Sequence, residues 1–277
     1  MNAVKNAESA LHQGEPAQAL KLLQDGVRAN PSDARLRVFL FQLLSVLGQW
    51  SRALNQLSVA AELDAAALPM AQTYREAIHC ESLRNEVFAG RKVPMIFGQP
   101  DAWLALLIES LLTAGKGDRE GAERLRLQAF DAAPASSGNI DGEPFAWLAD
   151  ADMRLGPVCE AVINGRYYWL PFANLRRIQF EEPADLRDVV WTPVHFEFTN
   201  GGESVGLIPT RYPGSESSTE PLVQLARRTE WLEARPGVFH GSGQRILSTD
   251  GGDKALMDVR LIEFDAVPAE GVEPADD

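Results

Sequence analysis

The sequence predicts an α+β protein, with an all-helical repeat domain over residues 1–135 and a mainly antiparallel β domain with minor helix over residues 136–265. Three observations support this. The first half repeats itself at a fixed spacing, the hydrophobic pattern changes from helical to strand-like near residue 136, and residues 266–277 are acidic and contain proline. Such a tail cannot bury enough apolar surface to fold, so we expect it to be disordered.

The helical half contains an internal repeat. The segment "GEPAQALKLLQ" from Gly14 matches "GQWSRALNQLS" from Gly48, 34 residues later, and "GDREGAERLRLQAF" from Gly117 is a looser third copy. A period of 34 is that of the tetratricopeptide repeat, a helix–turn–helix unit. We therefore predict a tetratricopeptide-like domain in which each of these glycines lies in the turn between two helices, where permissive dihedrals are needed.

Local signals predict where the helices end. Pro31 ends the second helix, and Ser32 or Asp33 is expected to cap the next one. Between the second and third copies, "QTYREAIHCESLRNEVFAG" predicts a further helix that ends near Gly90. Two prolines in "RKVPMIFGQP" then interrupt the helical pattern.

The second half has the pattern of a β domain. The segment "PASSGNIDGEP", residues 134–144, is interpreted as a linker or exposed loop. Beyond it, hairpins are predicted at Asn164-Gly165, at "TNGG" after "VHFEF" and at "DGGD" in "RILSTDGGDKALM", because such turn residues separate β-prone runs. One short helix is predicted in "PLVQLARRT".

Composition narrows the class of protein. The chain has 277 residues and a formal net charge of -13, which argues against nucleic acid as a partner because phosphates need a basic face. The N-terminal residues lack the apolar core of a signal peptide, and no apolar run is long enough to span a membrane. The two cysteines, Cys80 and Cys159, are expected to be buried, reduced thiols. We therefore expect a cytoplasmic protein without a membrane partner.

No motif predicts catalysis. No histidine lies at metal-ligand spacing from another His or Cys, and no phosphate-binding loop or nucleophile elbow occurs. No catalytic residue, metal or cofactor is therefore predicted. Asp150 and Asp152 are interpreted as part of a solvated loop or as partners of Arg154. The alternative is a hydrolase or ligand-binding protein in which these two carboxylates converge with Arg211 and Glu216.

The hexapeptide "RYPGSE", residues 211–216, combines a cation, a phenol, a turn, a hydroxyl and a carboxylate. Its centre predicts a type II turn with Pro213 and Gly214 in the middle. Arg211 is interpreted either as a clamp on acidic side chains of its own domain or as part of a docking loop, with Arg228 nearby. The candidate partner-binding residues are Arg211, Tyr212, Pro213, Gly214, Ser215, Glu216, Arg227 and Trp231.

Four segments in this order, behind the repeats, carry a family resemblance: "ADADMRLGPVCEAVINGRYYWLPF", "LIPTRYPGSE", "LARRTEW" and "GQRILSTDGGD". They resemble the ImpE/TagJ family, accessory proteins of bacterial type VI secretion systems. The resemblance implies a non-enzymatic adaptor that binds the small contractile-sheath subunit, TssB, through a helix near that subunit's N-terminus. It also implies assistance in sheath assembly or in disassembly linked to the ClpV unfoldase.

A partner helix of this kind is expected to dock by its apolar face in a groove. Because the chain is acidic, a partner segment selected by charge is expected to be basic or neutral. A generic repeat scaffold for another peptide is the remaining alternative. The sequence leaves the oligomeric state open.

Overall fold

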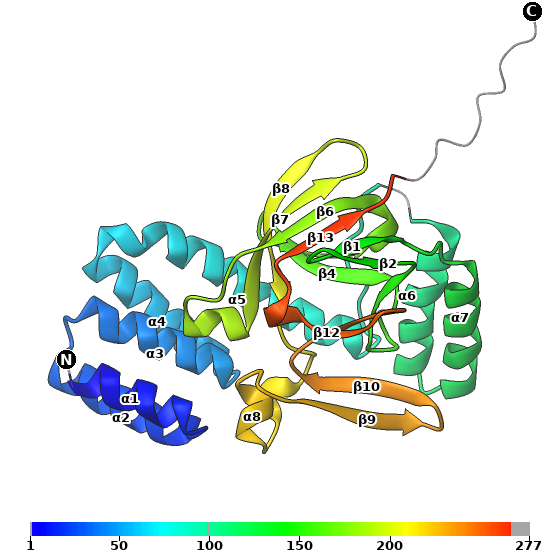
Figure 1. Ribbon diagram of the computed structural model, residues 1–277. Helices are drawn as coiled ribbons and strands as arrows, with labels where there is room; N and C mark the ends of the chain where they lie inside the picture. Colours follow the sequence, from blue (N-terminus) through cyan, green and yellow to red (C-terminus); the bar gives the residue numbers. More distant parts are fainter. Residues whose placement is uncertain (1, 99, 267–277) are drawn as a thin grey trace, which may run out of the picture.

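The computed structural model describes residues 2–98 and 100–266, so the predicted tail lies outside the described residues from residue 267 onward. The chain begins with two helical hairpins on one side of the molecule (Figure 1). They are formed by α1 (Asn2–His12) with α2 (Pro16–Ala29) and by α3 (Ala34–Val46) with α4 (Trp50–Leu63). Gly14 and Gly48 lie in the two turns with φ of 77° and 64°, as the repeat predicts. The Asp33 carboxylate caps α3 by accepting from the amides of Arg35 and Leu36.

The third copy of the repeat also forms a hairpin. A short 3₁₀ turn, η1 (Ala65–Ala67), leads into the predicted further helix, α5 (Leu68–Phe88). The hairpin consists of α6 (Ala102–Gly115) and α7 (Arg119–Ala132), with Gly117 in its turn at a φ of 90°. It lies at the opposite end of the molecule from α1–α4 (Figure 1), so it does not extend their stack. The helix α5 packs against α4 instead.

The β half is built on an eight-stranded antiparallel sheet with the strand order β2-β1-β13-β6-β7-β8-β4-β5. Its strands are β1 (Gly138–Ile140), β2 (Glu143–Phe145), β4 (Val158–Ile163), β5 (Arg166–Pro171), β6 (Leu175–Phe180), β7 (Trp191–Phe198), β8 (Glu203–Pro209) and β13 (Leu261–Phe264). The hairpins predicted at Asn164-Gly165 and at "TNGG" are β4–β5 and β7–β8. Short 3₁₀ turns η2 (Phe172–Asn174) and η3 (Leu186–Val189) connect these strands.

Two smaller sheets complete the fold. The hairpin predicted at "DGGD" is β11 (Ile246–Thr249) with β12 (Gly252–Ala255), and β3 (Leu148–Asp150) pairs with β11. The turn η5 (Leu256–Asp258) leads from β12 to β13. A separate two-stranded ribbon, β9 (Thr229–Arg235) with β10 (Val238–Gly243), follows the turn η4 (Ser215–Ser217) and the predicted short helix α8 (Pro221–Gln224).

Two parts of the sequence prediction were wrong or incomplete. Residues 134–144 are not only a linker, because β1 and β2 form a hairpin there around Asp141-Gly142, whose φ values are 51° and 90°. Three-residue strands carry too little alternation to be recognised. The ribbon β9–β10 was not predicted because nearly all of β9 is exposed, so its residues show no buried face.

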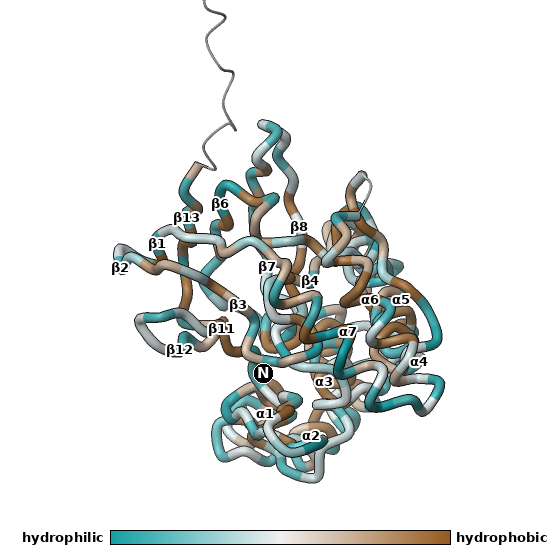
Figure 2. Tube along the Cα trace, turned by 90° about the vertical axis from the view of Figure 1, so that its right-hand side faces the viewer, coloured by the Kyte–Doolittle hydropathy of each residue, from teal (hydrophilic) through white to brown (hydrophobic). Residues whose placement is uncertain are grey.

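The hydrophobic core joins the two halves. Along β4, Val158 and Val162 belong to the cluster that also contains the helices, whereas Cys159, Ala161 and Ile163 belong to a second cluster on the other side of the sheet. This alternation is the two-residue period of a strand buried on both faces. Hydrophobic stretches therefore run through the interior, and the projecting tip of the β7–β8 hairpin is hydrophilic (Figure 2). Within the described residues, no helix is both long and apolar enough to cross a membrane.

Candidate functional site

A buried ionic cluster joins α5 to the sheet. It comprises Glu81, Arg84, Asp150, Glu160 and Arg245, and each of these side chains is at most 6% exposed. Arg84 binds the Glu160 carboxylate through Nε (2.6 Å) and Nη2 (3.0 Å), and its Nη1 reaches Glu81 (3.3 Å). Arg245 donates to both Glu160 and Asp150. Two arginines therefore hold three carboxylates where helix and sheet meet.

The cluster changes the acidity of its members. Burial alone would raise the pKa of Glu160, but Arg84 and Arg245 outweigh it and lower that pKa to about 2. Burial raises the pKa of Glu81 despite Arg84, and the indole Nε1 of Trp191 donates to this carboxylate (2.9 Å). The cluster thus holds a firmly ionised Glu160 at its centre.

The "RYPGSE" segment forms the predicted turn. Gly214 has a φ of 85° and a ψ of -5°, and the Ser215 amide donates to the Tyr212 carbonyl (3.3 Å), which matches a type II turn. Arg211 is 4% exposed, and burial lowers its pKa to about 10. It does not clamp acidic side chains: its Nη1 donates to the carbonyls of Val46 (2.9 Å) and Gln224.

Arg211 binds these two carbonyls for a simple physical reason. Val46 and Gln224 are the last residues of α3 and α8, and carbonyls at helix ends lack intrahelical donors. A buried guanidinium satisfies both at once. The carbonyl of Arg211 in turn accepts from Nη2 of Arg84 (2.7 Å), so the hexapeptide is continuous with the ionic cluster.

Tyr212 and Ser215 connect the hexapeptide to the strands that follow. The Tyr212 hydroxyl accepts from the Ile246 amide (3.0 Å), and the Ser215 hydroxyl accepts from the Gly243 amide (2.8 Å). Gly241 packs directly on the Tyr212 ring, so a side chain there would collide with it. Tyr212 and Ser215 are each at most 1% exposed, and their contacts with Gly241 and Gly243 fix the position of β10.

The other predicted partner-binding residues are more accessible. Gly214 and Arg227 are exposed, and Pro213 and Glu216 are half-buried. Arg227 donates to the carbonyl of Leu11 (2.8 Å) at the end of α1. Trp231 is 41% exposed, and its ring centroid lies 5.7 Å from that of Tyr212. These residues and the hexapeptide therefore surround the junction of the helical hairpins with the ribbon.

The two aspartates have structural partners. Asp150 is bound by Arg245, and Asp152 is bound by Arg154 through Nε (2.8 Å) and Nη2 (2.5 Å). Asp152 also accepts from the amide of Gly241 (2.8 Å), which lies on β10. The expected pairing of an aspartate with Arg154 is therefore confirmed.

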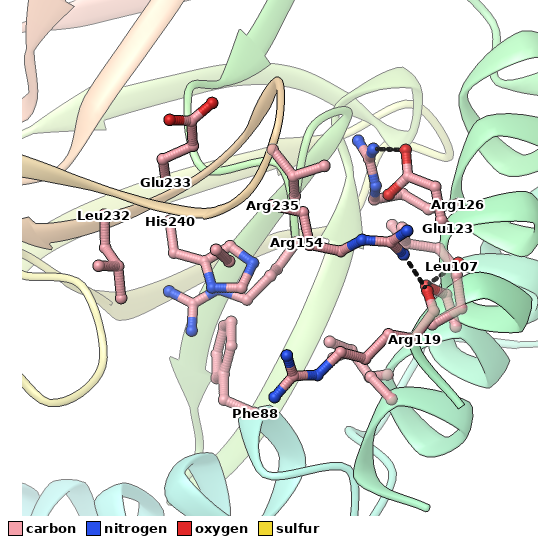
Figure 3. A pocket seen from close by; sticks show the side chains of 16 residues that line it. Phe88, Leu107, Arg119, Glu123, Arg126, Arg154, Leu232, Glu233, Arg235 and His240 are labelled. Atoms are coloured by element: carbon pink, nitrogen blue, oxygen red, sulfur yellow. Dashed lines mark hydrogen bonds and ion pairs between the residues drawn. The ribbon is translucent and has the colours of Figure 1, made fainter. Parts of the chain in front are cut away.

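A cleft of about 550 Å³ lies between the α6–α7 hairpin and the ribbon (Figure 3). Its apolar lining comes from both walls and from the end of α5, and includes Leu107, Leu111, Ala122, Leu232, Val238 and Phe88. Arg235 extends from the ribbon to α7, where its Nη1 donates to the Arg119 carbonyl (2.6 Å). Binding pockets commonly have volumes of about 300–1,000 Å³ and a mainly apolar lining, and the cleft fits that description.

The cleft is locally cationic. The arginines Arg119, Arg126, Arg154 and Arg235 line it, against Glu123 and Glu233 in the lining and Asp152, which is bound to Arg154, an excess of one positive charge in a chain of net charge -13. The Arg154 guanidinium stacks 4.8 Å from the Phe88 ring centroid. Burial lowers the pKa of His240, and the charge of Arg154 lowers it further, so this lining residue is neutral at pH 7.

One donor in the cleft lacks a partner. Arg126 is 6% exposed and is held in place by Glu123, which accepts from its Nη2 (2.5 Å), and by the Phe130 ring 5.4 Å away. Its Nη1 is buried and has no hydrogen-bond partner within the described part of the chain. Sequence reasoning missed this cleft because it depends on the unpredicted ribbon.

The fold and the cleft define a helical-repeat scaffold joined to a β domain. Within residues 2–98 and 100–266, no group of three or more His, Cys, Asp and Glu side chains is arranged to hold a metal ion. A tetratricopeptide repeat model matches residues 10–76, and a model described as ImpE protein matches residues 142–263.

Comparison with known proteins then gives the family. The chain is 53% identical to the type VI secretion system accessory component TagJ of Pseudomonas aeruginosa, over 95% of this chain and 92% of that protein. The crystal structure of protein VPA1032 from Vibrio parahaemolyticus superposes with a TM-score of 0.86, at 26% identity, over 95% of this chain and 98% of that one. The chain belongs to the ImpE/TagJ family of type VI secretion accessory proteins.

Proposed function

We propose that this protein is a cytoplasmic, non-enzymatic adaptor of a type VI secretion system that binds the small sheath subunit TssB through that subunit's N-terminal helix. In this role it assists sheath assembly or the disassembly linked to the ClpV unfoldase. The observation that carries the proposal is the similarity to TagJ over nearly the whole chain, which supports an accessory role in secretion. A helical-repeat scaffold with an open, partly apolar cleft is consistent with peptide binding.

The buried groups support a non-enzymatic role. The enzyme alternative requires Asp150, Asp152, Arg211 and Glu216 to face a common substrate. The first three are at most 4% exposed, and each is bound to a partner of its own within the protein. A general acid or base must instead lie within hydrogen-bond reach of a substrate proton.

The surface around the hexapeptide is proposed as part of the docking region. Its accessible members, Gly214, Arg227 and Trp231, would contact the partner. Its buried members, Arg211, Tyr212 and Ser215, would hold that surface in place through the contacts described above.

Isothermal titration with a synthetic peptide of the TssB N-terminal helix tests the proposed function. We expect saturable binding of this peptide and none of a scrambled peptide of the same composition. Full-length TssB should bind as well. The absence of binding by both the native peptide and full-length TssB at about 100 μM, an affinity limit of about -5.5 kcal/mol, would contradict the proposal.

A further inference from the structure

A second recess, of about 520 Å³, opens where the β7–β8 hairpin projects from the main sheet. Its lining includes two aromatic rings, Phe97 and Phe198, whose centroids lie 5.3 Å apart in an edge-to-face arrangement. Phe97 also stacks on Tyr168, with the ring centroids 4.5 Å apart, yet it is 46% exposed. The recess therefore presents an aromatic surface that the described residues leave partly uncovered, and such exposed apolar surfaces commonly mark contact sites.

The described chain ends beside this recess. In the sheet, Glu263 of β13 pairs with Arg177 of β6, and Leu175 at the start of β6 pairs with Phe198 of β7. The chain therefore leaves β13 two strands away from Phe198 and next to Asn174, which lines the recess. β13 ends at the same end of the sheet from which the β7–β8 hairpin projects (Figure 1). Since neighbouring strands lie about 4.8 Å apart, the aromatic lining is on the order of 10 Å from the end of the described chain.

The sequence that follows suits an aromatic surface. Residues 267–273, "VPAEGVE", combine the apolar Val267, Pro268 and Val272 with two glutamates. Segments that contain proline bind aromatic-lined grooves in an extended conformation that proline favours beforehand, so little entropy is lost on binding. Seven residues span at most about 25 Å, and the five strand spacings from β13 to β5 amount to about 24 Å. The segment is therefore long enough to cross the recess.

Two exposed arginines flank the recess, Arg176 beside the end of β13 and Arg166 at the start of β5. Neither makes an ion pair within residues 2–98 and 100–266. Arg166 pairs across the β4–β5 hairpin with Ile163, which lines the recess. Glu203, an acid in the lining, lies 3.4 Å from His195. An acidic segment that crosses the recess from β13 thus has a cation near each end of its path.

We propose that residues 267–273 bind across the aromatic recess of their own chain. Val267 and the proline that follows it contact Phe198, and Val272 contacts Phe97. The segment acts as a strap that closes the recess to other peptides that contain proline. The occupant is part of this chain, so the inference does not depend on the proposed function.

An ion pair sets the direction of the segment. Glu273 is the last residue of the segment, and its carboxylate binds Arg166 on β5. Because this pair is exposed, it contributes less to binding than the apolar contacts and mainly selects one orientation. A segment of this composition can become ordered on a surface although it cannot fold alone, so the predicted disorder applies to its unbound state.

The test measures the distance between two nitroxide labels in the full chain by double electron–electron resonance. One label is attached at Ala275→Cys, just beyond the segment. The other is attached at Val205→Cys, a position on β8 that is 73% exposed and does not line the recess. Cys80 and Cys159 are buried, and burial raises the pKa of each thiol to about 12, so neither is expected to react with the label.

Further substitutions in this labelled chain separate the recess from other causes. Phe97→Ser removes the exposed ring from the recess, and Val267→Ser changes the segment itself. Leu127→Ser is the matched control, because Leu127 is also a large apolar side chain, 55% exposed, but lies on α7 and does not line the recess. Circular dichroism confirms that the variants are folded.

We expect a narrow distance distribution, because the bound segment holds residue 275 at a fixed place relative to β8. Phe97→Ser and Val267→Ser should each replace it by a broad distribution, and Leu127→Ser should leave it unchanged. Arg166→Gln and added salt should each lower the narrow fraction, since salt screens an exposed ion pair. A broad distribution without further substitution, or a narrow one that survives Phe97→Ser, would overturn the inference. Insensitivity to Arg166→Gln would overturn the ion pair.

Discussion

The arginines of the ionic cluster and those of the cleft differ in how completely their donors are used. In the cluster, every side-chain nitrogen of Arg84 and Arg245 donates to a carboxylate or carbonyl. In the cleft, Arg126 is almost as deeply buried, yet its Nη1 has no partner within the described residues. The same residue type thus serves in one place to hold two halves of the molecule together and in the other keeps one buried donor unsatisfied.

The difference follows from what surrounds each group. The cluster lies between two packed layers, α5 and the sheet, where an unpaired charge would be too costly to keep. Arg126 lies beside the cleft, where Glu123 accepts from its Nη2 and its Nη1 is enclosed by protein atoms. The completely satisfied arginines of the cluster are therefore the ones that hold helix and sheet together.

Arg84→Met should have the largest effect on stability. It leaves the Glu160 and Glu81 carboxylates in a buried site with Arg245 as the remaining cation of the cluster, and breaking a buried ion pair in this way costs about 3–5 kcal/mol. Urea denaturation at pH 7 measures the loss, and the fluorescence of Trp169 and Trp191, which lie beside the cluster, reports it. The double variant Arg84→Met/Glu160→Leu should recover part of the loss. A loss below about 1 kcal/mol would show that the cluster does not hold the halves together.

The acid dependence of stability should show the next largest effect. The pKa of Glu160 is about 2 in the folded protein, below its usual value of 4.5. Its contribution is therefore fully present above about pH 4.5 and is lost as the pH falls toward 2. At about 1.4 kcal/mol per pKa unit, the contribution is roughly 3 kcal/mol. Urea midpoints measured from pH 5 to pH 2.5 should fall less steeply for Glu160→Gln than for the wild-type protein, and equal slopes would contradict the assignment.

Much of the fold was predictable because its signals are local. The repeat period, the turn glycines, the Asp33 cap and the Asn164-Gly165 hairpin each depend on a few neighbouring residues, and all are present. The type II turn in "RYPGSE" was predictable for the same reason. The predicted division into domains at residues 135 and 265 stays a prediction.

The candidate site was less predictable because its contacts join distant segments. Arg211 meets Val46 and Gln224, and the cleft brings α7 against a ribbon about 110 residues later, so no local pattern identifies either. Of the two interpretations of Arg211, the clamp on acidic side chains of its own domain is wrong, since its partners are carbonyls at helix ends. The expectation that a partner segment selected by charge is basic or neutral stays a prediction.

Arg211→Gln should have the smallest of these effects and gives the sharpest comparison between a buried and an exposed arginine. It removes the donor shared by the carbonyls of Val46 and Gln224, and losing a charged donor to buried acceptors costs about 2 kcal/mol. Arg227→Gln is the matched control, because Arg227 also donates to helix-end carbonyls, at Leu11 and His12, but is exposed. We expect it to cost less than about 1 kcal/mol, since water replaces the lost donor. Urea denaturation of the two variants side by side measures the difference. Equal losses would mean that burial of Arg211 adds nothing, and that the "RYPGSE" segment does not anchor the helical hairpins to the β half.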